Sequence, residues 1–277
     1  MHTWFQETAY SMSAPVPIAV VEALRERIRC LDGGARHRRA VLPFGIKAID
    51  GRLPEGGLAL GALHEVGGGG NGAIDGAAAA LFAAGIAART RGRVLWCVTR
   101  QDLFAPALAS VGLAPDRVIY VEAGDDKSVL ACFEEGLRHG ELGAVVAEIA
   151  HLSMIASRRL QLAAEGSGTI GLAVRRWRRQ ADAAEFVQPT AASTRWRVSA
   201  LPSTPLPVPG VGRARWRLEL IRCRGGESAR FEVEACDTKG RLALPASRRA
   251  SQASGSPFRM VSDGKACELL PNWKRVS

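Results

Sequence analysis

Residues 63–74 read LHEVGGGGNGAI. A short apolar run leads into Gly67–Gly72, which has the GxxxxG spacing of a phosphate-binding loop, and an Ala-rich helical segment follows. In a working loop the next two residues are Lys and Ser or Thr, which neutralise the β- and γ-phosphates and bind Mg²⁺. Here those positions hold Ala73 and Ile74. The stretch therefore predicts the scaffold of a nucleotide hydrolase without the residues that hydrolysis needs.

Strand-like and helix-like segments alternate on either side of this loop, at the spacing that is typical of βαβ units. The predicted strands cover residues 62–66, 94–98, 118–121, 143–148 and 169–174, and the predicted helices cover residues 75–89, 106–111, 126–138 and 155–165. After about residue 190 polar and apolar residues alternate, which predicts antiparallel strands at residues 195–198, 215–220 and 231–234. The sequence therefore predicts an α/β fold with a P-loop core, a mainly parallel sheet and an antiparallel extension.

Two segments are predicted to flank a single core domain. Residues 1–39 form an N-terminal arm, in which an amphipathic helix precedes a basic linker, and residues 40–245 form the core. Residues 246–277 are rich in Ser, Arg, Gly and Pro and are predicted to be a disordered or partner-docked tail. Apolar residues without an obvious core to join are Val21, Leu24, Ile28 and Leu31 in the arm, and Phe258, Met260, Leu269, Leu270 and Trp273 in the tail. We expect the arm to take part in self-association and the tail to bind a protein partner.

Basic residues are concentrated in the second half of the chain. The formal net charge is +10, but residues 1–150 hold 15 Lys and Arg against 17 Asp and Glu, whereas residues 151–277 hold 22 against 10. This asymmetry predicts a polyanionic or acidic partner for the second half. Charged faces that are merely solvated are the alternative explanation.

One basic run, Arg175-Arg176-Trp177-Arg178-Arg179, directly follows the predicted strand at residues 169–174. In open α/β sheets, ligands bind at the carboxyl ends of the strands. Guanidinium groups neutralise phosphates and an indole ring stacks on bases, so the run predicts a contact with nucleic acid. The alternative is a solvated loop in which Trp177 is half-buried.

Several classes of protein are excluded by what the sequence lacks. No 18 consecutive residues are apolar and free of charge, and residues 1–13 lack the basic and apolar regions of a secretion signal. The six cysteines include no CxxC pair and have no histidine at ligand spacing. We therefore expect a cytoplasmic protein that binds no membrane, holds no metal and keeps its thiols reduced.

Longer strings of sequence resemble a known family. Residues 44–58, FGIKAIDGRLPEGGL, followed by the glycine loop, resemble the core of RecA-type recombinases. More specifically, the chain is similar to the ImuA family, a RecA-related component of a bacterial SOS mutagenesis cassette. The resemblance covers about residues 40–245 and is carried by LPFGIKAIDGRLPEGGLALGALHEV (42–66), VLWCVTRQDLFAPALASVGL (94–113), SRRLQLAAEGSGTIGLAVRR (157–176) and ARWRLELIRCRGG (214–226).

The resemblance implies a function in DNA repair. ImuA proteins work with ImuB, a catalytically inactive homologue of Y-family polymerases, and through that complex with an error-prone replicative-type polymerase. The expected role is therefore that of a non-catalytic, nucleoid-associated accessory factor in the SOS response to DNA damage, which binds an ImuB-type homologue and DNA during translesion synthesis. The alternatives are an ATP-dependent, recombinase-like motor and an SOS regulator of cell division.

The resemblance to RecA-type cores also locates the residues that an ATPase would use. The position of the catalytic glutamate matches Arg100, the Walker-B aspartate matches Glu148, and the sensor glutamine falls near Arg176. Because a cation does not polarise water as a general base does, we expect no ATPase activity. The vestigial phosphate loop comprises Gly67, Gly68, Gly69, Gly70, Asn71 and Gly72. We expect no cofactor, with weak binding of ATP and Mg²⁺ at this loop and Glu148 as the alternative.

Overall fold

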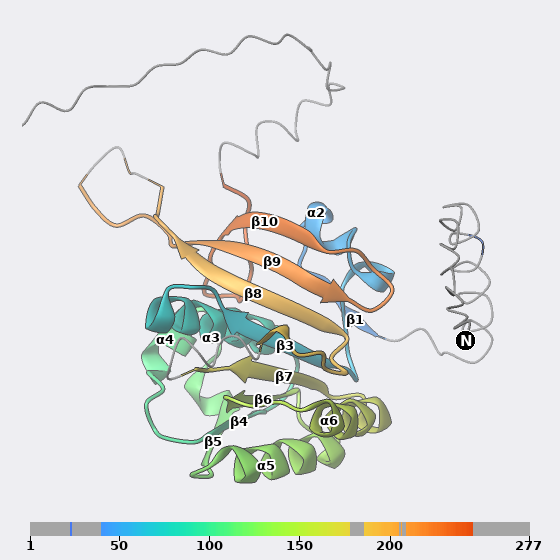
Figure 1. Ribbon diagram of the computed structural model, residues 1–277. Helices are drawn as coiled ribbons and strands as arrows, with labels where there is room; N and C mark the ends of the chain where they lie inside the picture. Colours follow the sequence, from blue (N-terminus) through green and yellow to red (C-terminus); the bar gives the residue numbers. More distant parts are fainter. Residues whose placement is uncertain (1–22, 24–39, 178–185, 205, 207–208, 246–277) are drawn as a thin grey trace, which may run out of the picture.

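The computed structural model describes residues 23, 40–177, 186–204, 206 and 209–245 (Figure 1). Its centre is an eight-stranded sheet with the strand order β10-β9-β8-β3-β7-β6-β4-β5. The strands are β3 (Leu63–Gly68), β4 (Val94–Val98), β5 (Val118–Glu122), β6 (Ala144–Ile149), β7 (Ile170–Arg175), β8 (Thr194–Leu201), β9 (Arg215–Cys223) and β10 (Ala229–Glu234). Strands β3 to β8 pair in parallel, whereas β9 and β10 continue the sheet in antiparallel pairing. The predicted α/β fold with an antiparallel extension is confirmed.

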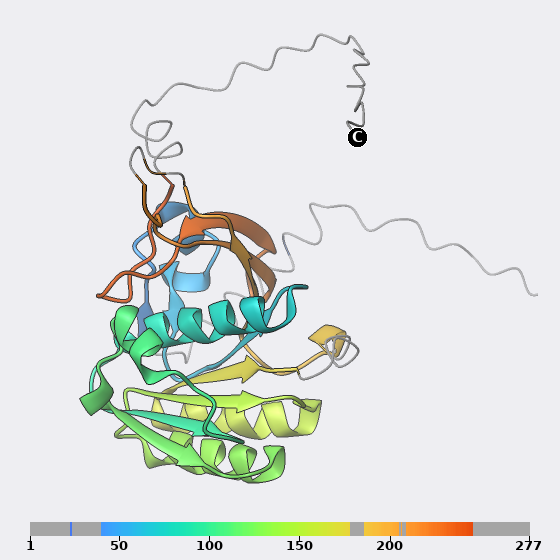
Figure 2. The same cartoon turned by 90° about the vertical axis from the view of Figure 1, so that its left-hand side faces the viewer.

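Helices cover the sheet on two sides (Figures 1 and 2). The longer ones are α3 (Gly72–Ala88), α4 (Ala105–Ser110), α5 (Asp126–His139) and α6 (Met154–Ser167), and the short elements are β1 (Val41–Leu42), α2 (Lys47–Asp50), η1 (Pro54–Gly56), β2 (Leu58–Ala59) and η2 (Pro115–Arg117). Helices α3 and α4 lie on one face of the sheet, and α5 and α6 lie on the other. Each face encloses its own hydrophobic core.

Local sequence signals fix the ends of α5 and α6. Asp125 and Ser153 are their N-caps, and each side chain accepts a hydrogen bond from a backbone N–H of the first turn. Gly140 and Gly168 end the two helices in the left-handed conformation that favours glycine. These caps hold the two helices side by side on their face of the sheet.

The core around α3 is rich in aromatic residues. Phe82 of α3 stacks on Phe44, and Trp196 of β8 meets both rings edge-on. The small side chains of α3 allow close approach: a Cβ at Gly85 would lie 2.3 Å from Sγ of Cys236. Helix α3 therefore packs tightly against both the parallel strands and the antiparallel extension.

The thiols in the described part of the chain are unpaired and largely buried. Cys97, Cys132, Cys223 and Cys236 are free cysteines. Burial raises the pKa of both Cys97 and Cys236 to about 12, which keeps these two thiols protonated at neutral pH. In the described ranges, no helix is long and apolar enough to cross a membrane.

The predicted arm and tail lie outside the described residues. This applies to Val21, Leu24, Ile28 and Leu31, to Phe258, Met260, Leu269, Leu270 and Trp273, and to Arg178 and Arg179 of the basic run. The division into arm, core and tail, and the binding roles of these side chains, therefore stay predictions.

Candidate functional site

The segments that the sequence singled out meet at the carboxyl edge of the parallel strands. Strand β3 ends at Gly68, β6 carries Glu148 next to its last residue, and β7 ends at Arg175. The segment after β4 adds Arg100 and Asp102. This is the edge at which open α/β sheets bind ligands.

The glycine loop is closed by a side chain of its own helix. The carboxylate of Asp75, in the first turn of α3, is only 2% exposed. Its Oδ2 accepts a hydrogen bond from the backbone N–H of Asn71 at 2.9 Å, and its Oδ1 accepts one from Ala200 N at 2.8 Å. A helix N-terminus and its loop N–H groups are where such folds bind a phosphate. Here the Asp75 carboxylate accepts from one N–H of the loop and ties the loop to the end of β8.

Three of the loop glycines leave room for neighbouring groups of the same chain. A Cβ at Gly67 would lie 2.9 Å from the rings of Phe186 and Trp177, and one at Gly68 would lie 2.9 Å from the backbone of α3. A Cβ at Gly69 would lie 2.2 Å from the hydroxyl of Ser199 and 2.5 Å from the Asp75 carboxylate. Internal packing therefore accounts for glycine at these three positions.

The guanidinium group of Arg176 pairs with Glu148, the residue that the resemblance matches to the Walker-B aspartate. Glu148 is 3% exposed, and its Oε1 accepts a hydrogen bond from the indole N–H of Trp96 at 2.9 Å. Its Oε2 accepts one from Arg176 Nη1 at 2.5 Å, and Arg176 also donates to both carboxylate oxygens of Asp102, at 2.7 and 3.0 Å. Burial lowers the pKa of Arg176, but the two carboxylates outweigh burial and raise this pKa above its ordinary value. The guanidinium therefore stays charged and pairs with both carboxylates.

A second ion-pair cluster is completely buried beneath this edge. Glu65 of β3 is fully buried, and its two oxygens lie 2.7 Å from Arg175 Nη1 and 2.7 Å from Arg195 Nε. Thr190 Oγ1 donates a further hydrogen bond to Glu65, and Arg175 also donates to the carbonyl of Ala150. We call Glu65, Arg175 and Arg195 the buried triad.

The buried triad corrects the predicted nucleic-acid contact. Arg175 is 1% exposed. Its Nη1 donates to Glu65 and its Nη2 donates to the carbonyl of Ala150, so it is not placed to contact DNA. Trp177 is half-buried and packs edge-on against Phe186, with ring centroids 5.4 Å apart. Of the basic run, only Arg176 is described with an exposed charge, and this charge is shared with Glu148 and Asp102. The Trp177 ring also lies close to Gly67, and its predicted stacking role stays a prediction.

Several polar groups at this edge are engaged within the chain. The N–H of Asn71 donates to Asp75, and the carboxylate of Glu148 accepts from Arg176. Arg100, which the resemblance matches to the water-orienting glutamate, is exposed. Across the described ranges, no group of three or more His, Cys, Asp or Glu side chains is arranged to hold a metal ion.

Comparison with known proteins assigns the family. A scan against protein-family models finds no match. Protein ImuA of Caulobacter vibrioides (strain NA1000 / CB15N) is 39% identical over 213 residues, which cover 74% of this chain and 87% of that protein. This chain belongs to the ImuA family. Protein ImuA of a second strain of the same species (ATCC 19089 / CIP 103742 / CB 15) matches to the same extent, and the resemblance found in the sequence is confirmed.

A solved structure supports the fold of this ImuA-family chain. The crystal structure of the RadB recombinase superposes with a TM-score of 0.50 at 19% identity, over 73% of this chain and 98% of the recombinase chain. At this level of identity the likeness concerns the fold alone. It confirms the predicted RecA-like core.

Sequence reasoning missed the residues that close the site. Asp75 was assigned only to the start of a helix, and Asp102, Glu65 and Arg195 received no role. One signal was available: Glu65 interrupts an apolar strand, and a buried carboxylate requires a cation nearby. Ala200, which donates to Asp75, and Trp96 and Arg176, which donate to Glu148, come from distant parts of the chain, and nothing in the local sequence identifies them.

Proposed function

We propose that this ImuA-family chain is a non-catalytic accessory factor of translesion DNA synthesis after DNA damage, which binds an ImuB-type polymerase homologue and DNA. The observation that carries the proposal is the double closure of the nucleotide edge, by Asp75 in the loop and by Arg176 on Glu148. A RecA-like scaffold closed in this way offers its surfaces for binding instead of a catalytic centre. The family supplies the cellular context, in which an error-prone replicative-type polymerase joins through the homologue.

The magnitudes argue against the alternative of an ATP-driven motor. Loss of one well-placed charge stabiliser typically lowers an enzymatic rate by about 10²–10³-fold. The chain lacks the P-loop lysine, the metal-binding hydroxyl and the water-orienting glutamate, since these positions hold Ala73, Ile74 and Arg100. A phosphate would in addition have to displace the Asp75 carboxylate from its two backbone hydrogen bonds.

The first prediction is an absence of nucleotide chemistry. We expect the full chain to show no ATP turnover above background, with or without DNA and with or without the ImuB-type homologue. A fluorescent ATP analogue should likewise give no saturable binding in the presence of Mg²⁺. An ATP-hydrolysing RecA-type recombinase serves as the positive control. DNA-stimulated turnover that disappears in Glu148→Ala would overturn the proposal and favour the motor.

Among the described residues, exposed apolar side chains gather on α6 and offer a surface for the protein partner. Ile155 is 75% exposed and Leu162 is 66% exposed, although both are large aliphatic residues. They are seven positions apart, which is two helical turns, so they lie on the same side of the helix. Exposed apolar residues that gather on one side mark interaction sites, and here Arg158 and Arg159 lie on the turn between the two.

The second prediction tests this surface in the complex. We expect the double substitution Ile155→Asp/Leu162→Asp to weaken capture of the ImuB-type homologue by more than about 30-fold, because burying each side chain contributes about 1.5–3 kcal/mol. Val211→Asp is the matched control, since Val211 is an equally apolar side chain that is 92% exposed elsewhere. Deleting residues 246–277 tests the tail in the same assay. Undiminished capture by the double variant, with loss in the deletion, would assign the contact to the tail instead.

A further inference from the structure

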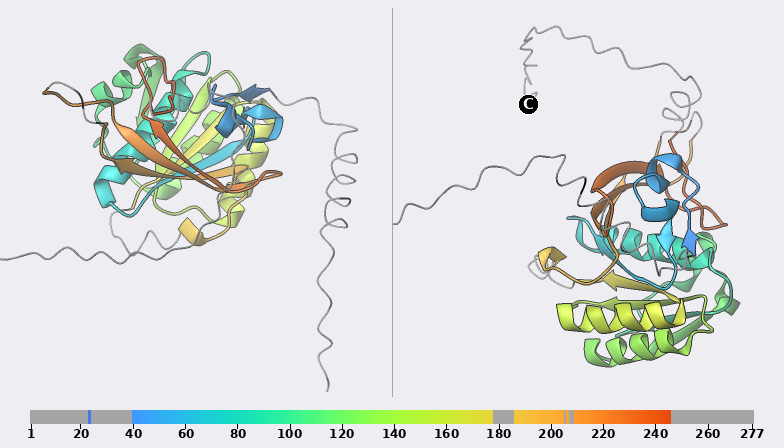
Figure 3. Two further views of the ribbon diagram at one scale, coloured as in Figure 1. Left: turned by 90° about the horizontal axis from the view of Figure 1, so that it is seen from above. Right: turned by 90° about the vertical axis from the view of Figure 1, so that its right-hand side faces the viewer.

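Strands β8, β9 and β10 expose one face of the sheet that no described helix covers. Helices α5 and α6 lie over the parallel strands on that side and stop short of the extension, whereas α3 packs behind it (Figures 1 and 3). The inner face of the extension carries the buried Trp196, Trp216 and Leu218. The outer face therefore carries the alternate residues, which are mainly charged.

The charged residues of this outer face form two clusters, each of one glutamate between two arginines. Glu219 lies 3.4 Å from Arg197 Nη1 and 3.0 Å from Arg230 Nε. Glu232 lies 3.1 Å from Arg215 Nη2 and 3.9 Å from Arg217 Nη2. We call these six residues the open arginine face: Arg197, Arg215, Arg217, Arg230, Glu219 and Glu232.

The two clusters carry a net positive charge. Four guanidinium groups stand against two carboxylates, and Glu234, which alternates with Glu232 along β10, adds a carboxylate that pairs with Arg213. In the Glu219 cluster the carboxylate side chain is only 17% exposed, whereas Arg230 is 80% and Arg197 is 40% exposed, so the glutamate supports the arginines from beneath. Arg217, 47% exposed, borders a shallow hollow of about 220 Å³ together with Arg230.

The ion pairs leave these arginines available to an external anion. A guanidinium group has five N–H donors, and each arginine uses only part of them on its glutamate. Exposed ion pairs of this kind contribute about 0–1 kcal/mol, so a phosphate can take over a donor at little cost. Neighbouring strands are about 4.8 Å apart, so the three strands span about 10 Å. One strand of duplex DNA carries one charge per about 3.4 Å of helix axis. The face thus matches several consecutive phosphates.

We propose that the open arginine face binds the phosphate backbone of DNA without regard to base sequence. This proposal rests on the proposed function, because that function makes DNA the polyanion which the chain would bind. It replaces the basic run as the described contact surface. The extension's tryptophans, Trp196 and Trp216, are buried on the opposite side of the sheet, so base stacking contributes nothing here and affinity should fall steeply with salt.

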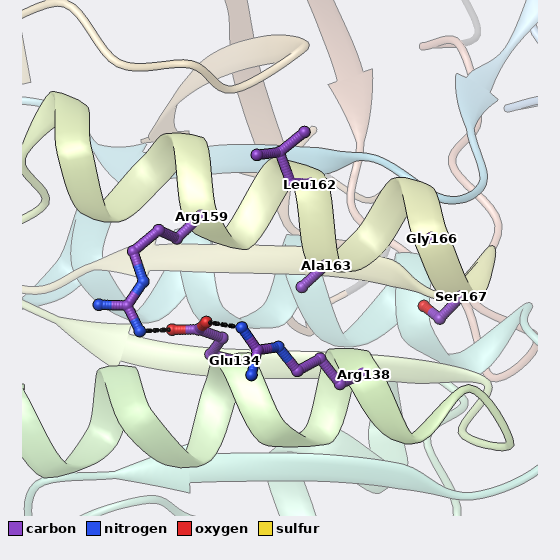
Figure 4. Close-up of a pocket in the computed structure, with 7 residues that line it drawn as sticks. All are labelled: Glu134, Arg138, Arg159, Leu162, Ala163, Gly166 and Ser167. Atoms are coloured by element: carbon purple, nitrogen blue, oxygen red, sulfur yellow. Dashed lines mark hydrogen bonds and ion pairs between the residues drawn. The ribbon is translucent and has the colours of Figure 1, made fainter.

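The test compares two chemically matched clusters in the full chain. Glu134 lies 2.6 Å from both Arg138 and Arg159, between α5 and α6, and so forms a third cluster of the same kind away from the open arginine face (Figure 4). Its arginines are 60% and 65% exposed. Arg197→Gln/Arg230→Gln is therefore compared with Arg138→Gln/Arg159→Gln, each of which removes two exposed guanidinium groups from one glutamate.

The measurement is fluorescence anisotropy with oligonucleotides of about 30 nucleotides, single-stranded and duplex, between about 50 and 200 mM salt. We expect Arg197→Gln/Arg230→Gln to lower affinity for at least one of the two DNA forms by about five- to ten-fold per lost phosphate contact near 0.1 M salt, and to flatten the salt dependence accordingly. Arg138→Gln/Arg159→Gln should match the unsubstituted chain. An unchanged thermal unfolding midpoint establishes that both variants are folded.

Substitutions that remove the glutamates, instead of the arginines, distinguish a role in DNA binding from a structural role of the ion pairs. Glu219→Gln/Glu232→Gln removes two negative charges from the face, so the phosphate contact should become tighter, whereas a purely structural cluster would give no gain. Equal loss in the two arginine variants would overturn the proposal, and so would binding that depends on base sequence. No binding of either DNA form by the unsubstituted chain would overturn this proposal together with the DNA contact of the proposed function, whereas DNA binding that is undiminished in Arg197→Gln/Arg230→Gln would overturn this proposal alone.

Discussion

Replacing Glu65 by alanine is expected to lower the free energy of unfolding by about 3–5 kcal/mol, because it leaves two guanidinium groups buried without a counter-charge. Arg175 is 1% exposed and Arg195 is 4% exposed, so neither can reach water without opening the core. The measurement is urea-induced unfolding followed by tryptophan fluorescence. Trp196 is fully buried in a strand adjacent to Glu65 and reports on the same region.

Glu134→Ala is the matched control for this prediction. It also removes one glutamate from between two arginines, but Arg138 and Arg159 are more than half exposed and are hydrated in either case. We expect a loss of about 1 kcal/mol or less. Similar losses in Glu65→Ala and Glu134→Ala would contradict the view that burial, and not the ion pair itself, makes Glu65 indispensable.

Removing the carboxylate that closes the glycine loop should have the second-largest effect. In Asp75→Ala the N–H groups of Asn71 and Ala200 lose a charged acceptor, and hydrogen bonds to charged groups contribute about 1.5–3 kcal/mol each. We expect the free energy of unfolding to fall by about 2–4 kcal/mol. Asp116→Ala, at an exposed aspartate, should change it by less than about 0.5 kcal/mol.

The same variant tests whether Asp75 stands in for a phosphate. Without the carboxylate, the N–H of Asn71 loses its internal acceptor and can donate to an external anion, so inorganic phosphate should raise the unfolding temperature of Asp75→Ala and not that of the unsubstituted chain. The comparison uses chloride at equal ionic strength as the reference. If phosphate stabilised both proteins equally, the loop would be open in the unsubstituted chain, and the interpretation of Asp75 would be wrong.

The elements of the fold were predictable from the sequence because burial and periodicity leave a local trace. Residues 94–98 form an unbroken apolar run and are a parallel strand between β6 and β5, almost completely buried. The alternation at residues 215–220 correctly predicted a strand with one buried and one charged face.

The chemistry of the edge was only half predictable, because it depends on contacts between distant residues. The missing lysine and hydroxyl are evident at Ala73 and Ile74, where the motif specifies them. Arg175 and Arg176 are adjacent in the chain, yet one is buried against Glu65 and the other lies on Glu148 at the edge. A run of arginines gives no local signal for which member is buried, because the glutamates that pair with Arg175 and Arg176 lie on other strands.

The position of β8 has a consequence for how the protein unfolds. This strand pairs with β3 on one side and β9 on the other, and Asp75 of α3 binds the backbone of Ala200 within it. The parallel and antiparallel halves of the sheet thus share one hydrogen-bond ladder and one hydrophobic core. They should melt in a single cooperative transition. A chain shortened before residue 194 would strip β3 of a neighbour and open the aromatic core, so the closed loop and the charged extension persist together or are lost together.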